Sequence, residues 1–280
     1  MIRKSIVAHV GQRGTRMRLS KPRFIPTVFS LVLTLAMVSV TVHSQAFAIG
    51  IENVLFNFNA GGTEATGSFP HSTLIEDAHG NLYGTTTNGG ASEVGTVFEL
   101  SPPATNGGAW TETVLYNFGA YTNDGRTPWT WGTGLAVDGN GNLYGTTQNG
   151  GTYAEGTAWE LSPPAISGGA WTETVIWNFG QPGVTDGLDP TSGLTIDNNG
   201  NLFGTTLYGQ TPTVGFGGTV YELSPPSGMS GTWTEKVLAQ FSESNGQYVN
   251  GFYPFAGVIG DGSGNLYGTT SSGGIYGIGQ

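Results

Sequence analysis

The sequence predicts an all-β fold, a β-propeller-like array of four-stranded antiparallel blades, and three observations support this prediction. A six-residue phrase, NLYGTT or NLFGTT, recurs at 81–86, 142–147, 201–206 and 265–270. Short apolar or alternating segments, each bounded by turn residues, surround every copy and predict short strands. Glycine and proline recur too often for long helices. The near-constant spacing indicates a tandem array of one supersecondary unit.

Residues 134–179 serve as the model repeat, and each of their four predicted strands has its own signal. Residues 134–138 form a short apolar strand, and the turn 139–141 leads to a second strand at 142–147. A glycine-rich loop precedes the third strand, 157–161, which ends at Ser162-Pro163-Pro164. Residues 171–179 alternate polar and apolar side chains, as a half-buried strand does. Four antiparallel strands per repeat are typical of a propeller blade. A β-solenoid is the alternative, and it is less favoured because solenoid repeats are usually shorter.

The same pattern predicts the limits of the repeats. Blades are expected at about 74–118, 135–179 and 194–241, and a fourth, incomplete blade is expected at 258–280. Residues 51–58 resemble the last strand of a blade without the first three, so they are expected to form an orphan strand. We therefore expect the sequence to be a fragment that stops inside a blade of the repeat domain 49–280.

The first 48 residues have the composition of a cleaved signal peptide. They carry seven of the nine Lys and Arg residues, an apolar run at about 28–42, and Ala46-Phe47-Ala48. A basic region, a short apolar core and a small-x-small site predict secretion, with cleavage after about Ala48. Met17 is an alternative start. An uncleaved anchor helix is the competing interpretation, but the run is short and broken by Ser and Thr.

The chain beyond residue 48 is strongly acidic. Only Arg126 and Lys236 remain as strong cations against nineteen Asp and Glu, which gives a net charge of −17. This charge repels phosphate backbones and anionic membranes, so nucleic acid is excluded as a partner and no membrane span is expected after cleavage. The chain has no cysteine, so its stability must come from apolar burial between repeats.

The full motif resembles a known family. It runs D-x-x-G-N-L-Y-G-T-T, then G-G, then G-T-V-F-E-L-S-P-P, then W-T-E-T-V-L-Y-N-F, and it covers 77–118, 138–179, 197–241 and 261–274. It is similar to the GloVer (Gloeo/Verruco) tandem repeats of secreted bacterial proteins. The resemblance implies an exported, surface-associated protein, often with a C-terminal PEP-CTERM sorting signal, and no such tail is visible in the sequence. It implies no established enzymatic activity.

The D-x-x-G-N segments, which contain Asp77, Asp138, Asp197 and Asp261, raise the question of calcium. The segment 138–142 begins like a calcium loop, but such a loop needs Gly at its sixth position and Glu at its twelfth. Leu143 and Asn149 stand there. A hairpin turn in which Asp caps the turn and Gly takes the left-handed position explains the motif without metal. No metal ligand is therefore assigned, and calcium stays open as the one cofactor considered.

Candidate catalytic groups are few. Glutamates recur in the third and fourth strands of each complete repeat, at Glu99, Glu160, Glu222, Glu112, Glu173 and Glu235. Their recurrence predicts solvated strand faces rather than the single carboxylate pair of a glycosidase. Beyond residue 48, His71 and His79 are the only histidines. Without cysteine or a histidine cluster, nucleophilic triads and transition-metal sites are poorly supported, and no catalytic residue is assigned.

The loops differ between copies, and they therefore carry the candidate ligand-binding residues. Aromatic rings beside polar side chains are what a sugar-binding surface uses. The alternative is that these rings pack between blades. We expect a secreted, non-catalytic protein that binds a glycan or a protein at the cell surface. An extracellular lyase or glycosidase that uses the same face, with Arg126 as the residue to test, is the alternative. The candidate residues are Tyr121, Asp124, Arg126, Trp129, Trp131, Tyr153, Tyr208 and Phe252.

Overall fold

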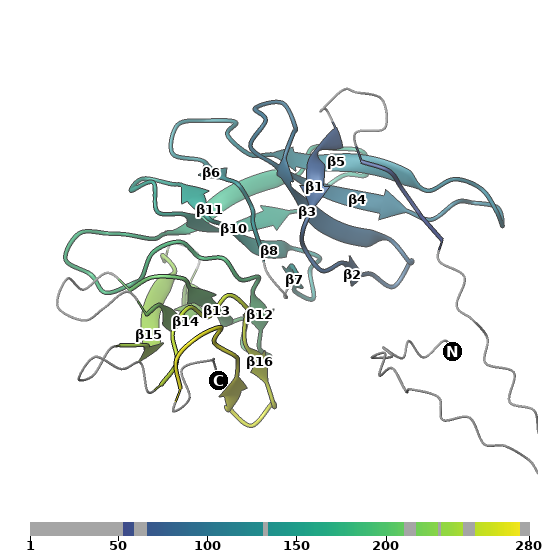
Figure 1. The fold of residues 1–280 in the computed structure, drawn as a ribbon. Coiled ribbons are helices and arrows are strands. Elements are labelled where there is room, and N and C mark those ends of the chain that lie inside the picture. Colours follow the sequence, from purple (N-terminus) through teal and green to yellow (C-terminus); the bar gives the residue numbers. More distant parts are fainter. Residues whose placement is uncertain are drawn as a thin grey trace, which may run out of the picture. The chain divides into compact units, whose positions relative to one another are not determined.

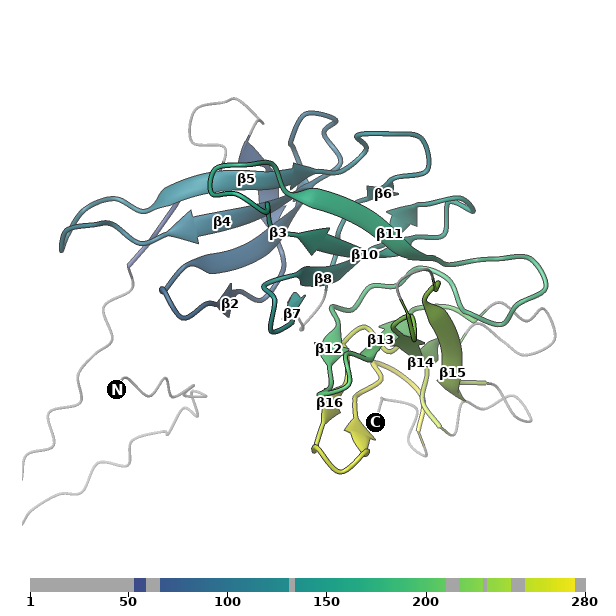
Figure 2. The same ribbon diagram turned by 180° about the vertical axis from the view of Figure 1, so that it is seen from behind.

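Each repeat folds into an antiparallel sheet in which consecutive main strands are neighbours. The computed structural model describes residues 53–58, 66–130, 134–209, 217–228, 231–242 and 250–274, all within the structural unit 52–280. These residues contain antiparallel β-sheets and no α-helix (Figure 1). The all-β prediction, with its four-stranded antiparallel sheets, is confirmed. Figure 2 shows the same strands from behind.

Seventeen strands are present in the described residues. The first repeat comprises β1 (Ser68–Pro70), β2 (Ile75–Glu76), β3 (Leu82–Asn88), β4 (Thr96–Ser101) and β5 (Thr111–Asn117). The second comprises β6 (Gly125–Arg126), β7 (Ala136–Val137), β8 (Leu143–Thr147), β9 (Asn149–Gly150), β10 (Thr157–Ser162) and β11 (Thr172–Asn178). The third comprises β12 (Thr195–Ile196), β13 (Leu202–Thr206), β14 (Thr219–Ser224) and β15 (Thr234–Gln240). The fourth comprises β16 (Ile259–Gly260) and β17 (Leu266–Tyr267).

The four main strands of the second repeat lie in the order β7-β8-β10-β11, as the model repeat predicts. The third repeat has the same order, β12-β13-β14-β15, and in the first repeat β2, β3, β4 and β5 pair in succession. A register shift interrupts the pairing of the last two strands in each of the three sheets, between Val97 and Phe98, Ala158 and Trp159, and Val220 and Tyr221. The irregularity therefore belongs to the repeat, and it lies where the third strand carries its aromatic residue.

The glycine of the NLYGTT phrase makes room for that aromatic side chain. Gly145 is paired with Trp159, and a Cβ atom on Gly145 would lie 2.4 Å from the indole ring. The phenol of Tyr221 lies equally close to Gly204, and the ring of Phe98 would be 2.7 Å from a Cβ on Gly84. Any larger residue would displace the ring, so the glycine is required by packing.

A phenylalanine from the preceding repeat covers the same aromatic side chain. The rings of Phe118 and Trp159 are 5.5 Å apart, and those of Phe179 and Tyr221 are 5.0 Å apart. All four side chains are fully buried. Each aromatic residue thus contacts a glycine of its own repeat and a phenylalanine of the repeat before it, which links successive sheets through their cores.

The two threonines of the phrase add polar links. The first donates across the repeat boundary: Thr146 Oγ1 lies 2.6 Å from the carbonyl oxygen of Ser192, and Thr205 Oγ1 lies 2.8 Å from that of Pro254. The second forms a 2.8 Å hydroxyl pair with the first residue of the third strand, as Thr147 does with Thr157. Because these hydroxyls are buried, each needs its partner.

The orphan strand expected at 51–58 is a wrong prediction for its described part, 53–58, where no residue is in a strand. A strand needs a neighbouring ladder, and no described strand pairs with this segment. The segment contributes a ring instead. Phe58 packs on Phe98 with the ring centroids 4.7 Å apart, the same contact that Phe118 and Phe179 make with the repeats that follow them.

Gly145→Ala should destabilise the protein by about 1–3 kcal/mol, because the added methyl group overpacks a core that Trp159 already fills. Urea denaturation of the purified protein measures this change. Gly139→Ala is the matched control, since a Cβ there meets nothing within 4 Å. Equal stability of the two variants would contradict the packing role of Gly145.

Candidate binding surface

Two hollows flank one loop of the second repeat, the segment 149–154 between β8 and β10. The first, the polar hollow, has a volume of about 490 Å³ and is lined by Thr122, Asn123, Asp124, Arg126, Asn149, Gly150, Gly151 and Ala154. The second, the aromatic hollow, has a volume of about 240 Å³ and is lined by Thr152, Tyr153, Ile176, Trp177, Asn178, Gln181, Thr232 and Trp233. Residues 149–151 and Ala154 of the loop line the polar hollow, and Thr152 and Tyr153 line the aromatic hollow, so the two hollows are neighbours.

A short strand pair builds the polar hollow. β6 pairs with β9 so that Arg126 lies opposite Asn149, and the amide of Gly151 donates to the carbonyl oxygen of Asp124. Equivalent pairing joins β1 to β3 in the first repeat, and single bridges occur at Leu188 with Tyr208 and at Phe252 with Ser272. Arg126 is exposed in this frame.

Asp124 is buried at the base of the polar hollow. Its Oδ2 accepts hydrogen bonds from the Tyr116 hydroxyl and the Ala120 amide, both at 2.8 Å. Its Oδ1 is buried and has no hydrogen-bond partner. Asp186 repeats this position in the third repeat and is also fully buried. The carboxyl group is therefore part of the repeat, whereas the exposed Arg126 is a feature of this copy.

The aromatic hollow collects side chains from two repeats. Tyr153 comes from the loop, Trp177 from β11, and Trp233 from the segment that leads into β15. Asn178 fixes the loop, because its Oδ1 accepts the Thr152 amide at 2.7 Å. Trp233 also packs edge-on against Tyr144, with the ring centroids 6.1 Å apart. The hollow therefore has three rings and two side-chain amides along its wall.

The structure brings only some of the predicted candidate residues together. Asp124 and Arg126 share the polar hollow, and Tyr153 lies in the aromatic hollow next to it. The ring of Trp129 stacks on His71 at 5.6 Å. The Tyr121 hydroxyl donates to Glu173 Oε2 at 2.7 Å.

Two further candidates gather elsewhere. The rings of Tyr208 and Phe252 both contact Tyr253, at 5.8 Å and 4.5 Å. Trp131 lies outside the described residues.

The sequence analysis does not single out Trp177 or Trp233: the first falls within the predicted strand 171–179 and the second within the predicted repeat 194–241. A signal for Trp177 exists in the sequence: the first repeat has Tyr116 at this position and the third has Ala239. Trp233 recurs as Trp110 and Trp171, so no difference between copies marks it. Its place in the hollow follows from the packing of the third repeat against the second.

The expectation that the fourth-strand glutamates face solvent is wrong. Glu112, Glu173 and Glu235 each bury one carboxylate oxygen without a hydrogen-bond partner. Burial raises the pKa of Glu112 to about 7. Burial is also the largest cause for Glu173, whose pKa rises to about 7 although the Tyr121 hydroxyl opposes the rise. Burial, together with the charge of Asp186, raises the pKa of Glu235 to about 7 as well. At Glu173 the alternating pattern misled because Tyr121, from the loop after β5, reaches this strand face and donates to the carboxylate.

The D-x-x-G-N segments form the predicted turns. Asp138 Oδ1 accepts the amides of Asn140 and Asn142 at 2.8 and 2.9 Å, while its Oδ2 accepts the side chains of Asn142 and Tyr144. Asp261 makes the equivalent four contacts. These hydrogen bonds hold the pKa of its carboxyl group below the usual value, and the bond from the Asn265 side chain has the largest effect. These aspartates act as turn caps. Calcium, which the sequence leaves open, is not tested by these contacts.

The described residues contain no group of three or more His, Cys, Asp or Glu side chains placed to hold a metal ion. Nor does the described part of the chain include a helix with the length and apolar character needed to cross a membrane.

The fold and surface define a tandem-repeat protein built of antiparallel sheets. The chain matches the model of the Gloeobacter/Verrucomicrobia repeat over residues 36–280 and therefore belongs to this family. The resemblance noted from the NLYGTT phrase and its flanking motifs is confirmed. No curated protein matches the chain significantly.

The buried glutamates predict that stability falls as the pH rises. Glu173 keeps its proton to about pH 7 in the folded protein but loses it near pH 4.5 when unfolded. Its contribution is thus fully present below pH 4.5 and lost as the pH rises through 7. Glu173→Gln should stabilise the protein at pH 8 by roughly 1–2 kcal/mol after solvent screening, and change little at pH 4.

Urea denaturation midpoints at pH 4, 6 and 8 measure this difference. Glu76→Gln, at an exposed position of β2, is the control and should shift all three midpoints equally. A Glu173→Gln variant whose stability follows the control at every pH would rule out a buried, protonated Glu173.

Proposed function

We propose that the chain is a secreted, non-catalytic repeat protein that binds a carbohydrate at the surface formed by the aromatic and polar hollows. One observation carries the proposal: Tyr153, Trp177 and Trp233 line one hollow together with Asn178 and Gln181. Aromatic faces pack against the apolar faces of sugar rings, and amides bond the hydroxyl groups.

The neighbouring polar hollow extends this surface. Asn123, Asn149 and the exposed Arg126 line it, and they provide both donors and acceptors. Since one loop separates the two hollows, a chain of several sugar units could lie across both. A cation in an otherwise strongly acidic chain also provides the complement to an acidic sugar.

The difference between repeats supports assigning binding to this copy. The second repeat has Tyr153 where the first has Ser92, and Trp177 where the first has Tyr116. The scaffold contacts, by contrast, are the same in both. A binding site needs one special surface, and this is the place where the second repeat departs from the shared pattern.

The proposal also covers the arrangement of the sheets as propeller blades and the export of the protein. We propose that the sheets are propeller blades whose first strands face a common axis. The contact between β7 and β12 supports this, as does the hydrogen bond from the Thr195 hydroxyl to the carbonyl oxygen of Val258. The sequence of residues 1–48 supports export through a cleaved signal peptide.

An extracellular lyase or glycosidase is the alternative function, and the carboxyl groups favour binding over it. A glycosidase needs one pair of carboxyl groups at a defined separation. The buried carboxyl groups near the hollows recur instead: Asp124 as Asp186, and Glu173 as Glu112 and Glu235. Carboxyl groups that recur in successive repeats are best explained by a structural role in the repeat.

Screening the protein on a polysaccharide and oligosaccharide array tests the proposal. We expect binding that Tyr153→Ser weakens at least tenfold, since this change removes the ring and installs the residue of the first repeat. Tyr267→Ala, which removes another exposed ring outside both hollows, is the control and should bind normally. An array without any bound sugar, or binding that Tyr153→Ser leaves intact, would contradict the proposal.

A further inference from the structure

The side chain of Arg126 is an exposed cation in the lining of the polar hollow. Beyond residue 48 the chain has only one other strong cation, Lys236, which lies opposite Glu222 in the pair of β14 and β15. Arg126 lies opposite Asn149 instead, and its side chain forms no ion pair with any described residue. Its guanidinium group is therefore available to an anion.

The backbone that carries Arg126 is held from two repeats. The Thr127 amide donates to the carbonyl oxygen of Val94, in the first repeat, at 2.8 Å. The carbonyl oxygen of Thr127 in turn accepts the amide of Gln148, in the second repeat, at 3.0 Å. The exposed side chain thus extends from a fixed point, which lowers the entropy cost of ordering it against a ligand.

The second repeat differs from the first in charge at two positions of this hollow. Arg126 stands where the first repeat has Ser68, and both residues lie opposite an asparagine of the paired strand. Ala154 lines the hollow at the position where the first repeat has the exposed Glu93. The second repeat therefore adds a cation and lacks an exposed carboxylate at the same surface.

The carboxyl groups nearest to Arg126 in the chain do not occupy the surface of the hollow. Asp124 is 1% exposed, its Oδ2 accepts two hydrogen bonds and its Oδ1 is buried. Glu155 follows Ala154 but turns away, since its Cγ would lie 2.6 Å from a Cβ atom on Gly180. Arg126 is therefore the one exposed charged side chain among the residues that line the polar hollow.

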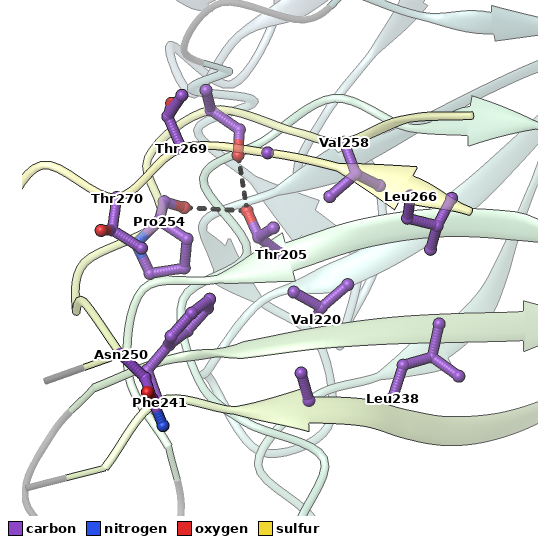
Figure 3. A pocket seen from close by; sticks show the side chains of 13 residues that line it. Thr205, Val220, Leu238, Phe241, Asn250, Pro254, Val258, Leu266, Thr269 and Thr270 are labelled. Atoms are coloured by element: carbon purple, nitrogen blue, oxygen red, sulfur yellow. Dashed lines mark hydrogen bonds between the residues drawn. The ribbon is translucent and has the colours of Figure 1, made fainter. Parts of the chain in front are cut away.

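Another cavity of the described residues lacks this chemistry. It has a volume of about 290 Å³, and Figure 3 shows Val220, Leu238, Val258 and Leu266 around it. No charged side chain is among its lining residues. An exposed cation is thus a property of the polar hollow and not of every cavity in this fold.

Arg126 is suited to a carboxylate. A guanidinium group donates two parallel hydrogen bonds to the two oxygens of a carboxylate, and it keeps its charge at every physiological pH. The side-chain amides of Asn123 and Asn149 line the same hollow and can donate further hydrogen bonds. In a polysaccharide, a carboxylate on the sugar ring defines a uronic acid.

We propose that the binding surface selects a polysaccharide that contains uronic acid. Arg126 would bind the carboxylate of one sugar, while the rings of the aromatic hollow hold the apolar face of its neighbour. This inference rests on the proposed function and names the class of its ligand. The net charge of the chain repels a polyanion, so the selectivity has to come from local pairing at Arg126.

Two variants restore the charge of the first repeat. Arg126→Ser installs the residue that Ser68 provides in β1, and Ala154→Glu installs the residue that Glu93 provides. The backbone accepts the second change, because Glu93 and Ala154 have the same left-handed conformation, with φ of 59° and 65°. Lys236→Gln is the matched control: it changes the net charge by the same amount from β15, outside both hollows.

The probes are polygalacturonate, alginate and hyaluronate, each immobilised beside its carboxyl-reduced form, and dextran sulfate as a sulfated polyanion. Biolayer interferometry measures the affinity of the purified protein for each. We expect at least one uronate polymer to bind about fivefold more tightly than its reduced form. Arg126→Ser and Ala154→Glu should each bring this ratio close to one, whereas Lys236→Gln should keep it. Circular dichroism melts confirm that the three variants are folded.

Four results would overturn the inference. Equal affinity for each uronate polymer and its reduced form would do so, and the proposed function would still stand if the reduced forms bind through Tyr153. A preference that Arg126→Ser leaves intact, or that Lys236→Gln also removes, would not arise from pairing at Arg126. Binding of dextran sulfate alone would exclude the carboxylate as the recognised group. If none of these polysaccharides and no sugar on the array binds, the inference and the proposed function fail together.

Discussion

The contact between a third-strand aromatic residue and the glycine of the NLYGTT phrase is the constraint on which the rest of this structure depends. The ring takes the space that a side chain on the glycine would fill, and the phenylalanine of the preceding repeat covers it. A protein without disulfides must link its repeats through such buried contacts. The shift in strand register at Phe98, Trp159 and Tyr221 places each ring in its position.

This shared core frees the loops to differ. The hydrogen bonds of the two threonines and the turn aspartates recur in each complete repeat, so they hold the backbone in the same way whatever the loop carries. Even the left-handed backbone at Phe69, Thr127, Asp189 and Tyr253 recurs, and it therefore marks the repeat rather than a site. Within this frame the second repeat presents Tyr153 and Trp177 at positions where the first has Ser92 and Tyr116.

The local sequence pattern was sufficient to predict the strands, but it did not predict how one repeat packs against the next. All four strands expected in 134–179 are present within a few residues of their predicted limits, because alternation and turn residues are local signals. The pairing of β6 with β9 was not foreseen, since both are two-residue strands inside loops. Glu173 and Trp233 were misjudged for a related reason: what covers them comes from another segment of the chain.

Amide hydrogen exchange tests the central claim most directly, because it reports the four copies of the phrase within one molecule. If the third-strand aromatic residue and its strand hold the phrase in place, the amides of Thr85–Thr86, Thr146–Thr147 and Thr205–Thr206 should be strongly protected, and that of Thr269 should exchange rapidly. Equal protection of all four copies would show that the phrase is stable without its aromatic partner, and would contradict the account.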